Sequence, residues 1–533
     1  MIDVQLTLSF PSSSVNELTW HVISGNNKHQ MGANCGLCLY TYQESGMQKQ
    51  RALLFDIGTL TGDMSRPEDP ALYSSDIVMP DMSRFFYKRM DPSHQPQIPI
   101  DSIFLTHNHI DHTGAVPLLI LLGYKMPKIY ATPYTAKRLE QELSNAKLDP
   151  SEWPTIYTIA SGQPIPEGPV TVTAFGVSHS TPQSVGFFIE TPKGNILHTG
   201  DFKLDPSVAW GPAFREEQLK GIIGQKKVDL LLLDSTGADK DNAPITEDDV
   251  RESLAEVMKK HPGKRFIIAI MSGYEENLAS VAKVATERGR KLWVAGSAHE
   301  QSLAALKETG MSLSDHLGIE VDLQIVSTKV QAENLAAAKP RDTVVIVTGA
   351  LGHSHSSLTR AADGTNKMLK LNPKTDIVLF CAPVISGQEA ARNSLLARLS
   401  NTGLKVLTQK DRPLYSHAHA RQSEMVAFIK MCNPSFVAPV HGALKLRISC
   451  AEMITGIGAK VVQSENGDIV RVTPAGVSVL KTPQSGNPPL IGLQTLQGKN
   501  WNDKYYVVTK APSDQSAVVS KKNRPKILVP GKL

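Results

Sequence analysis

Four potential metal ligands follow an apolar run within six positions, and this stretch constrains the fold more than any other feature of the chain. They are His107, His109, Asp111 and His112 in the sequence FLTHNHIDH. In an extended chain His107 and His109 point to the same side, because side chains alternate with a period of two. A helix expected over Ala115–Gly123 would turn Asp111 and His112 inward from another direction. Imidazole and carboxylate ligands suit zinc or manganese, so the stretch predicts a site for two adjacent ions.

Further candidate ligands stand at the ends of other strand-like runs. His179 lies in GVSHS, Asp201 in HTGDF and His441 in APVHG. Loops at strand ends are where functional sites are commonly built. Together with the first cluster, these side chains are enough to fill two metal sites.

The character of the chain changes near its middle. At roughly 100–200 residues per domain, 533 residues predict two to four domains. The first 235 residues carry short β-rich runs and a second expected helix over Pro133–Asn145. Between about 245 and 410, an amphipathic helix over Glu275–Arg288 and others alternate with four continuous apolar runs: Phe266–Met271, Leu292–Ala295, Thr343–Val347 and Asp376–Cys381. Strands buried on both faces in this way predict a parallel sheet flanked by helices.

Charge and composition restrict the class of protein. The net charge is +5, but the segment Lys481–Leu533 holds nine basic and two acidic residues, which leaves the remaining chain near neutral. A basic tail favours a polyanionic partner. No apolar run reaches the roughly 20 residues that span a bilayer, and the start of the chain lacks the pattern of a secretory signal. With only five cysteines, the chain is expected to be cytoplasmic and not bound to a membrane.

The order of these motifs resembles the metallo-β-lactamase superfamily. Asp56 in LFDIG, the HNHIDH stretch, His179 and Asp201 resemble its four successive motifs, and His441 resembles the fifth. About 240 residues separate the fourth motif from the fifth, whereas simple hydrolases of the superfamily need only a few dozen. An inserted α/β domain in this gap is the hallmark of the β-CASP nucleases.

Within that group the chain is similar to ribonuclease J from about Gly32 to Val472. Asp234 in LLLLDST resembles motif A of the β-CASP proteins, His419 in SHAHARQ resembles motif B, and His441 resembles motif C. The resemblance implies an α/β fold, namely a metallo-β-lactamase αββα sandwich with an inserted parallel α/β domain and a short C-terminal appendage. The expected segments are 1–240 and 413–475 for the metallo-β-lactamase domain, 241–412 for the β-CASP domain and 476–533 for the appendage.

The resemblance also distributes the ligands between two divalent ions, Zn²⁺ in the first place and Mn²⁺ as the alternative. One ion would be held by His107, His109 and His179, and the other by Asp111, His112 and His441. Asp201 would bridge the two ions, and Asp56 would orient a ligand from behind. Two adjacent ions can activate water at neutral pH and stabilise both oxygens of an in-line displacement, so Asp111 and Asp201 count as catalytic.

Cleavage of a phosphodiester also needs a proton for the departing oxygen. His419 is the expected general acid, and Asp234 would hold its ring and favour its protonated form. The alternative for Asp234 is a helix N-cap together with Ser235 and Thr236. His417 lies two residues from His419 and either competes for the acid role or contacts a phosphate.

Three loops depart from the usual ribonuclease J pattern. Thr-Gly-Ser-Gln-Gly-Glu is replaced by TGALGH, which ends at His353, and the Ser-Asn motif with its following arginine is replaced by SGYEE, which begins at Ser272. The Ser-Gly-His before motif B becomes HAH. Since these loops contact RNA phosphates in the family, the candidate phosphate contacts here are His417, Ser272, Gly349 and His353.

The resulting hypothesis is a two-metal ribonuclease that acts on single-stranded RNA in RNA processing and decay. The resemblance implies 5′-to-3′ exonuclease activity, with endonuclease activity as a second mode, and a homodimer or homotetramer. Three alternatives remain: a β-CASP DNA nuclease, a small-molecule metallo-hydrolase such as a lactonase or thioesterase, and a nucleic-acid-binding protein without catalysis. The long gap that contains Asp234 and His419 argues against the small-molecule hydrolase.

Overall fold

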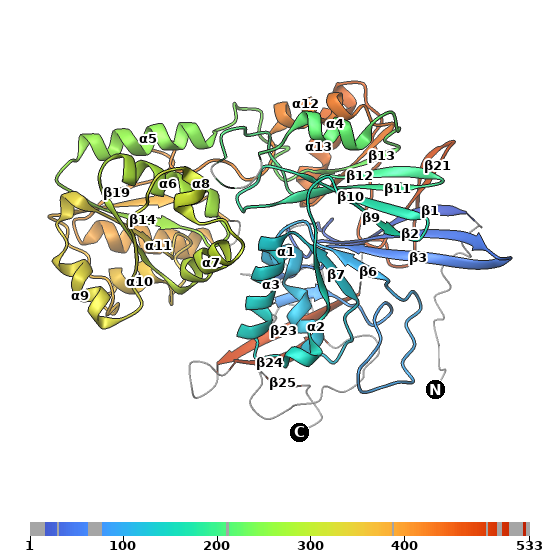
Figure 1. The fold of residues 1–533 in the computed structure, drawn as a ribbon, viewed down its shortest axis with the longest axis horizontal. Coiled ribbons are helices and arrows are strands. Elements are labelled where there is room, and N and C mark those ends of the chain that lie inside the picture. Colours follow the sequence, from blue (N-terminus) through green and yellow to red (C-terminus); the bar gives the residue numbers. More distant parts are fainter. Residues whose placement is uncertain are drawn as a thin grey trace.

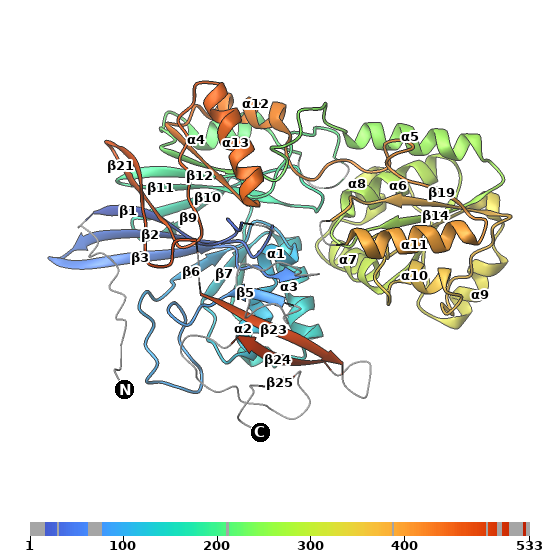
Figure 2. The ribbon, with the colours of Figure 1, turned by 180° about the vertical axis from the view of Figure 1, so that it is seen from behind.

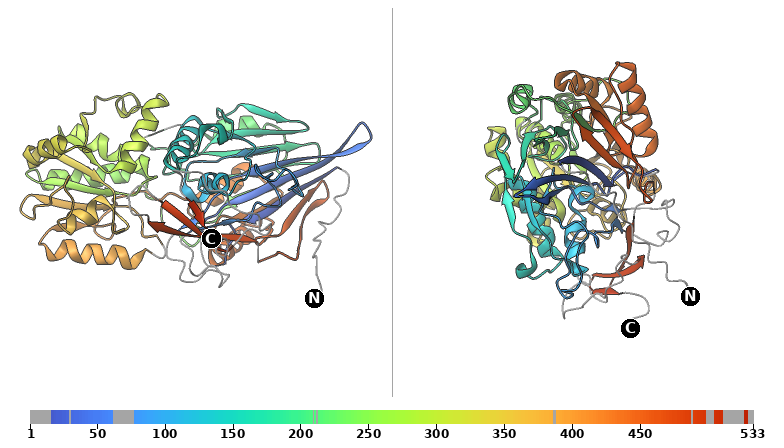
Figure 3. Two further views of the ribbon diagram at one scale, coloured as in Figure 1. Left: turned by 90° about the horizontal axis from the view of Figure 1, so that it is seen from below. Right: turned by 90° about the vertical axis from the view of Figure 1, so that its right-hand side faces the viewer.

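The computed structural model shows two bodies side by side, one built on two facing sheets and the other on a single parallel sheet (Figure 1 and Figure 3). It describes residues 16–28, 31–61, 77–208, 210, 213–385, 388–486, 489–497, 504–510 and 526–528. Within these ranges, no helix combines the length and apolar character that a membrane span requires.

The first sheet of the larger body has eight strands. In spatial order they are β22 (Gly476–Leu480), β21 (Ile469–Thr473), β1 (Glu17–Ser24), β2 (Cys35–Glu44), β3 (Met47–Phe55), β6 (Ser102–Phe104), β7 (Lys128–Ala131) and β8 (Ile156–Thr158). Successive side chains of β2 point to opposite faces of this sheet, and both faces are buried. Leu37 and Leu39 pack beneath the helices, whereas Cys38 and Tyr40 pack between the sheets.

The second sheet has six strands and faces the first. Its spatial order is β20 (Phe436–Val440), β13 (Leu230–Asp234), β12 (Gly194–His198), β11 (Val185–Thr191), β10 (Val170–Gly176) and β9 (Pro164–Glu167). The parallel pairing of β13 with β20 joins segments on either side of the inserted body, so the two halves of this domain complete one sheet.

Helices cover the outer face of each sheet, which gives four layers in the order αββα (Figure 1). The first sheet is covered by α1 (Ile110–Thr113), α2 (Ala115–Leu121) and α3 (Pro133–Asn145). The second is covered by α4 (Glu216–Ile223), α12 (Gln422–Cys432) and α13 (Leu444–Gly456). The expected metallo-β-lactamase sandwich is therefore the observed architecture.

The inserted body is the expected parallel sheet. Its spatial order is β16 (Leu323–Ile325), β15 (Lys291–Ala295), β17 (Thr343–Val347), β14 (Arg265–Ile270), β18 (Asp376–Cys381) and β19 (Lys405–Leu407), with every pair parallel. The helices packed against it are α5 (Glu247–Lys260), α6 (Glu275–Glu287), α7 (Ser297–Glu308), α8 (Leu313–Leu317), α9 (Lys329–Ala337), α10 (Ser357–Ala362) and α11 (Glu389–Asn401). Its four inner strands, β15, β17, β14 and β18, are apolar after their first residue because helices bury both faces of the sheet.

A buried polar network fastens the two bodies together. The Lys203 ammonium, which is fully buried, lies 3.0 Å from Asp205 Oδ2 and 2.8 Å from Ser416 Oγ. The backbone N–H of Glu247, at the start of α5, donates to Asp205 Oδ2 at 2.9 Å. Tyr134 of α3 is also buried in the core of the inserted body. The junction is thus packed and hydrogen-bonded.

The C-terminal segment adds strands to the larger body. The hairpin of β21 and β22 crosses the expected boundary between 475 and 476. Beyond it, β23 (Leu490–Gln497) pairs with β5 (Ile77–Pro80), and the sheet continues through β4 (Leu60–Thr61), β24 (Lys504–Lys510) and β25 (Lys526–Leu528), as Figure 2 shows from behind. Ile491 and Leu493 are buried in the core beneath α2, which anchors this segment.

Candidate metal centre

All the predicted metal ligands meet at one place, where loops leave the ends of strands. His107 and His109 follow β6, and His179 follows β10. Asp201 follows β12 and His441 follows β20. Asp111 and His112 lie in α1, whose backbone approaches so closely that a Cβ on Gly58 would lie 1.7 Å from the Asp111 carbonyl oxygen. A glycine is therefore required at position 58.

Three groups of possible ligand atoms share Asp201 among the described residues: two contain the predicted ligands, and a third consists of Asp201, Asp234, His419 and His441. The first group, called site 1 here, is His107, His109, His179 and Asp201. The second, called site 2, is Asp111, His112, Asp201 and His441. Within each group the ligand atoms lie within 4.8 Å of one another. The resemblance to the metallo-β-lactamase superfamily implies the same division of ligands.

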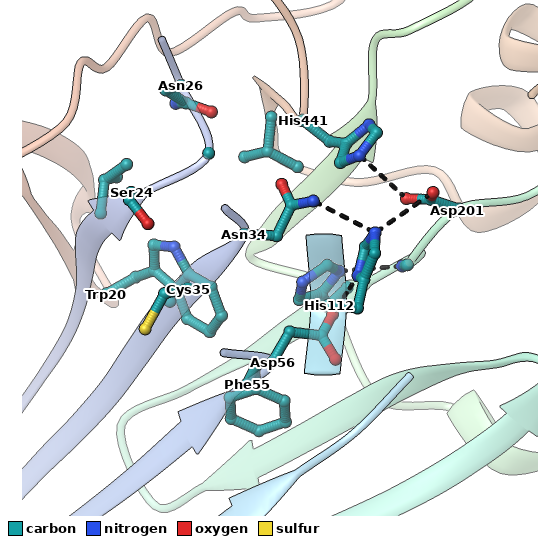
Figure 4. Close-up of a pocket in the computed structure, with 16 residues that line it drawn as sticks. Trp20, Ser24, Asn26, Asn34, Cys35, Phe55, Asp56, His112, Asp201 and His441 are labelled. Atoms are coloured by element: carbon teal, nitrogen blue, oxygen red, sulfur yellow. Dashed lines mark hydrogen bonds and ion pairs between the residues drawn. The ribbon is translucent and has the colours of Figure 1, made fainter. Parts of the chain in front are cut away.

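Distances within the two sites are similar. In site 1, Asp201 Oδ2 lies 3.7 Å from His107 Nε2 and 3.8 Å from His179 Nε2. In site 2, the same oxygen lies 3.2 Å from His112 Nε2, and Asp201 Oδ1 lies 3.6 Å from His441 Nε2. Figure 4 shows His112 and His441 converging on Asp201, with Asn34 and Asp56 behind them. One carboxylate therefore faces both groups of imidazoles.

Each imidazole is held by a hydrogen bond through its other ring nitrogen. The five pairs are His107 Nδ1 with Thr106 Oγ1 at 2.9 Å, His109 Nε2 with the Gly273 carbonyl at 2.9 Å, His112 Nδ1 with Asp56 Oδ2 at 2.7 Å, His179 Nδ1 with the Ala418 carbonyl at 2.8 Å, and His441 Nδ1 with Thr236 Oγ1 at 2.6 Å. Such partners fix the tautomer and orientation of metal-binding histidines. Asp56, predicted to orient a ligand, bonds to His112 directly.

The hydrogen-bonding pattern tests whether cations fit. Carbonyl oxygens accept from His109 Nε2 and His179 Nδ1, so in the neutral form of each ring the remaining nitrogen is an acceptor. These two nitrogens face each other at 3.2 Å. His107 Nε2 and Asp201 Oδ1 are also buried, with no hydrogen-bond partner among the described residues. Acceptors at such distances repel one another unless a cation lies between them, so the donor set fits a divalent metal.

Electrostatics distinguish the two sites. Burial lowers the pKa of His107 and His179 well below the usual value, with neighbouring imidazoles adding to the effect. Burial also opposes charge on His112 and His441, but Asp201 and Asp111 outweigh it and raise the pKa of both rings well above the usual value. In the metal-free protein these shifts favour the neutral form of His107 and His179 and the protonated form of His112 and His441.

His419 and Asp234 lie beside this centre and contact each other. His419 Nδ1 is 2.8 Å from Asp234 Oδ2, and 23% of the His419 side chain is exposed. Burial lowers the pKa of His419, but Asp234 and Asp201 outweigh it and raise the pKa above the usual value. Asp234 Oδ1 also accepts from the Thr236 N–H at 2.9 Å, although no helix begins there. The carboxylate therefore orients both the turn and the ring.

The candidate phosphate contacts are placed differently from one another. Both ring nitrogens of His417 are engaged inside the protein, by the Ile245 carbonyl and by Glu424 Oε2, each at 2.8 Å. Ser272 is exposed beside the loop that touches His109. Gly349 and His353 follow β17, and His353 Nε2 lies 3.0 Å from Gln388 Oε1. A phosphate contact by His417 would require one of its internal hydrogen bonds to break.

Sequence reasoning missed several residues that hold the ligands. Thr106 and Thr236 stand next to predicted residues, so their position was the available signal. Asn34 Nδ2 lies 3.1 Å from His112 Nε2 and 3.1 Å from the Asp111 carbonyl oxygen, yet nothing in its local sequence marks it. Gly273 and Ala418 act through backbone carbonyls, which leave no side-chain signal.

Comparison with known proteins agrees with this architecture. The family model described as "Beta-lactamase superfamily domain" matches residues 76–268, and the one described as "Ribonuclease J, beta-CASP domain" matches residues 263–399. The second match falls on the inserted parallel sheet. The two matches overlap at residues 263–268, at the start of β14 in the inserted body.

Several curated relatives align with most of the chain. Ribonuclease J of Sinorhizobium meliloti is 29% identical over 460 residues, which is 86% of this chain and 75% of the relative. Ribonuclease J 1 of Streptococcus pyogenes is 29% identical over 412 residues, or 76% of this chain and 68% of the relative. Ribonuclease J of Mycobacterium tuberculosis is 26% identical over 435 residues, or 80% and 72%.

A solved structure shares the fold. A protein of unknown function from Enterococcus faecalis superposes with a TM-score of 0.59 at 16% identity and covers 85% of this chain and 100% of its own. At that identity the likeness concerns the fold alone.

Proposed function

Because this chain belongs to the ribonuclease J type of metal-dependent β-CASP nucleases, we propose that it cuts single-stranded RNA from the 5′ end with two divalent cations, zinc in the first place. The observation that carries the proposal is the facing pair of acceptors on His109 and His179, 3.2 Å apart and each fixed by a carbonyl behind it. Such a pair is stable where a cation lies between the nitrogens.

The proposed ligands are those of the two sites. His107, His109 and His179 would hold one cation, Asp111, His112 and His441 the other, and Asp201 would touch both. When bound, a pair of divalent cations lowers the pKa of water and neutralises charge on a phosphodiester. Asp201 would link the two sites because its Oδ2 lies 3.7 Å from His107 Nε2 in site 1 and 3.2 Å from His112 Nε2 in site 2.

His419 would donate the proton to the departing 3′ oxygen. Its Nδ1 is held by Asp234 at 2.8 Å, so the other ring nitrogen carries the transferable proton. The raised pKa of His419 favours the protonated ring, which a general acid requires. His417 is a poorer candidate for this role since both of its nitrogens are engaged within the protein.

The inserted domain would supply the surface for RNA. The contact between His109 and Gly273 puts the carboxyl end of β14 at the metal centre. The loops after β15 and β17 lie at the same edge, because these strands are parallel neighbours of β14. Ligands of open parallel sheets bind at this edge. Ser272, Gly349 and His353 are the proposed phosphate contacts there.

The proposed location of the protein is the cytoplasm, and its free, buried cysteines agree with this.

The test is degradation of matched 5′-monophosphorylated single-stranded RNA and DNA, with zinc or manganese and with chelator. Mononucleotide release from RNA, lost with chelator and lost again in His419→Ala, is the expected result. Equal cutting of DNA would overturn the proposed substrate, and internal cuts alone would overturn the 5′-to-3′ direction. Activity that survives chelation would overturn the metal requirement.

A further inference from the structure

The two imidazoles that face each other in site 1 have hydrogen-bond partners at and beyond the edge of the metallo-β-lactamase sandwich. His109 Nε2 donates to the carbonyl of Gly273, which lies in the loop between β14 and α6 of the inserted domain. His179 Nδ1 donates to the carbonyl of Ala418, in the connecting segment that packs against the core of that domain. The orientation of His109 therefore depends directly on where the inserted domain sits, and that of His179 depends on the connecting segment.

Site 2 has no such dependence. His112 is held by Asp56, which follows β3, and His441 is held by Thr236, which follows β13. Both partners belong to the sandwich itself. A displacement of the inserted domain would leave these hydrogen bonds intact.

Further contacts tie the same loop of the inserted domain to site 1. Ser180 Oγ, next to His179, donates to the Gly273 carbonyl at 3.2 Å. The backbone N–H of Glu276 donates to the Ser180 carbonyl at 3.1 Å. The Tyr274 ring lies parallel to the His109 ring, with centroids 6.5 Å apart. The segment from 273 to 276 thus contacts two of the loops that carry site 1 ligands, those of His109 and His179.

Gly273 makes this contact in a conformation that suits glycine. Its φ is +89°, and a Cβ at this position would lie 2.9 Å from both Cδ2 and Nε2 of His109. Any side chain would push the ring of His109 away from the carbonyl. A Cβ at position 273 would therefore strain the backbone and require the His109 ring to shift.

We propose that binding of a cation at site 1 and docking of the inserted domain are one coupled equilibrium, with Gly273 as the positioning residue that links them. The inference rests on the two-metal function proposed above. When the domain is docked, the Gly273 carbonyl fixes His109 with Nδ1 toward the metal. When the domain moves away, the ring loses its acceptor and turns freely, so affinity at site 1 falls.

Reciprocity follows from thermodynamics. A cation that binds the docked form more tightly must also favour docking by the same factor. An opening of the domain that admits an RNA strand would weaken site 1 while site 2 keeps its ion. Occupancy of site 1 by a cation therefore stabilises the docked position of the inserted domain, and it can be used to measure docking.

The test compares Gly273→Ala with Gly289→Ala. Gly289 also has a left-handed φ, +64°, but a Cβ there meets no atom within 4 Å, so it controls for backbone strain in the same domain. Metal content after gel filtration and titration with Co²⁺, followed by its absorption spectrum, are the readouts. The unsubstituted protein and Gly289→Ala should hold two ions. Gly273→Ala should hold one, with affinity at the other site lowered about 10–100-fold.

Amide hydrogen exchange supplies a second readout, which does not depend on nuclease activity. The Glu276 N–H spans the junction to Ser180, so its protection reports docking. Addition of zinc should slow its exchange in the unsubstituted protein and in Gly289→Ala, and should do so much less in Gly273→Ala. If Gly273→Ala does not fold, the exchange of the unsubstituted protein decides alone.

The outcomes separate the two proposals. Two ions bound to Gly273→Ala with unchanged affinity, or zinc-independent exchange at Glu276, would overturn the coupling while leaving the two-metal function standing. Fewer than two ions on the unsubstituted protein would overturn the proposed function itself.

Discussion

The two metal sites use the same kinds of ligand, imidazoles and carboxylates, but their imidazole rings are oriented by different parts of the molecule. Site 1 is oriented by backbone carbonyls of the inserted domain and its return segment, at Gly273 and Ala418. Site 2 is oriented by side chains of the sandwich, at Asp56 and Thr236. One site therefore responds to the position of a domain, and the other to local structure alone.

The sites also differ in the protons they hold. His107 and His179 are neutral because burial lowers their pKa, whereas nearby carboxylates raise the pKa of His112 and His441 despite burial. A cation that binds at site 2 must displace protons from His112 and His441. A cation that binds at site 1 has fewer protons to displace from His107 and His179. Metal binding at the two sites is therefore expected to depend on pH to different extents.

The largest expected effect comes from Asp201, which both sites share. Asp201→Asn keeps the shape of a buried side chain but removes the negative charge that faces the imidazoles of both sites. Both ions should be lost together, and nuclease activity with them, since the loss should exceed the roughly 10–100-fold caused by removing a partner behind a ligand. Metal content by mass spectrometry checks this. One ion retained would show that the sites are independent.

Substitution of His419 separates proton donation from metal binding. His419→Ala should lower kcat by about 10²–10⁴-fold, which is typical of a lost general acid, while both ions stay bound. His417→Ala is the matched control two residues away, and its smaller loss should fall on stability because it breaks the bond to Glu424. Equal loss of kcat in both variants would contradict the assignment.

Asp56→Asn should affect site 2 more than site 1. Asp56 Oδ2 contacts the His112 ring directly at 2.7 Å, whereas it reaches His107 of site 1 only through the Thr106 hydroxyl. The amide is a weaker acceptor for the His112 N–H, and affinity at site 2 should fall by about 10–100-fold. Competition with a chromogenic chelator measures each site. A fall at site 1 of the same size would mean that the two sites are not held separately.

The smallest effect concerns pH. The pKa of His112 and His441 lies above the usual value of 6.5 in the metal-free protein, so these rings are protonated at and somewhat above that pH. Metal binding at site 2 should release up to about two protons there and strengthen as pH rises through the raised values. Calorimetry in buffers of different ionisation enthalpy counts the protons. No difference between the sites would contradict the electrostatic contrast.

Much of the fold could be predicted from local sequence. The expected helix over Pro133–Asn145 is α3, and the expected runs Thr343–Val347 and Asp376–Cys381 are β17 and β18. Apolar periodicity carried these predictions because both faces of the elements are buried. The expected helix over Ala115–Gly123 ends sooner, at Leu121, because a turn follows it.

The ligands of the centre could be proposed from sequence because they stand in short motifs at strand ends. Their orienting partners could not be found in the same way. Gly273 lies 164 positions from His109, and Ala418 lies 239 positions from His179. Each contributes a carbonyl that any residue carries. Only the docking of the inserted domain brings these carbonyls to the rings.

The most direct test of the central claim is a crystal structure of the zinc-loaded protein with anomalous data collected on both sides of the zinc absorption edge. Two peaks about 3.5–4 Å apart should appear. One should lie between His109 and His179, the other between Asp111 and His441, with Asp201 touching both. A single peak, or peaks away from these side chains, would contradict the two-metal account.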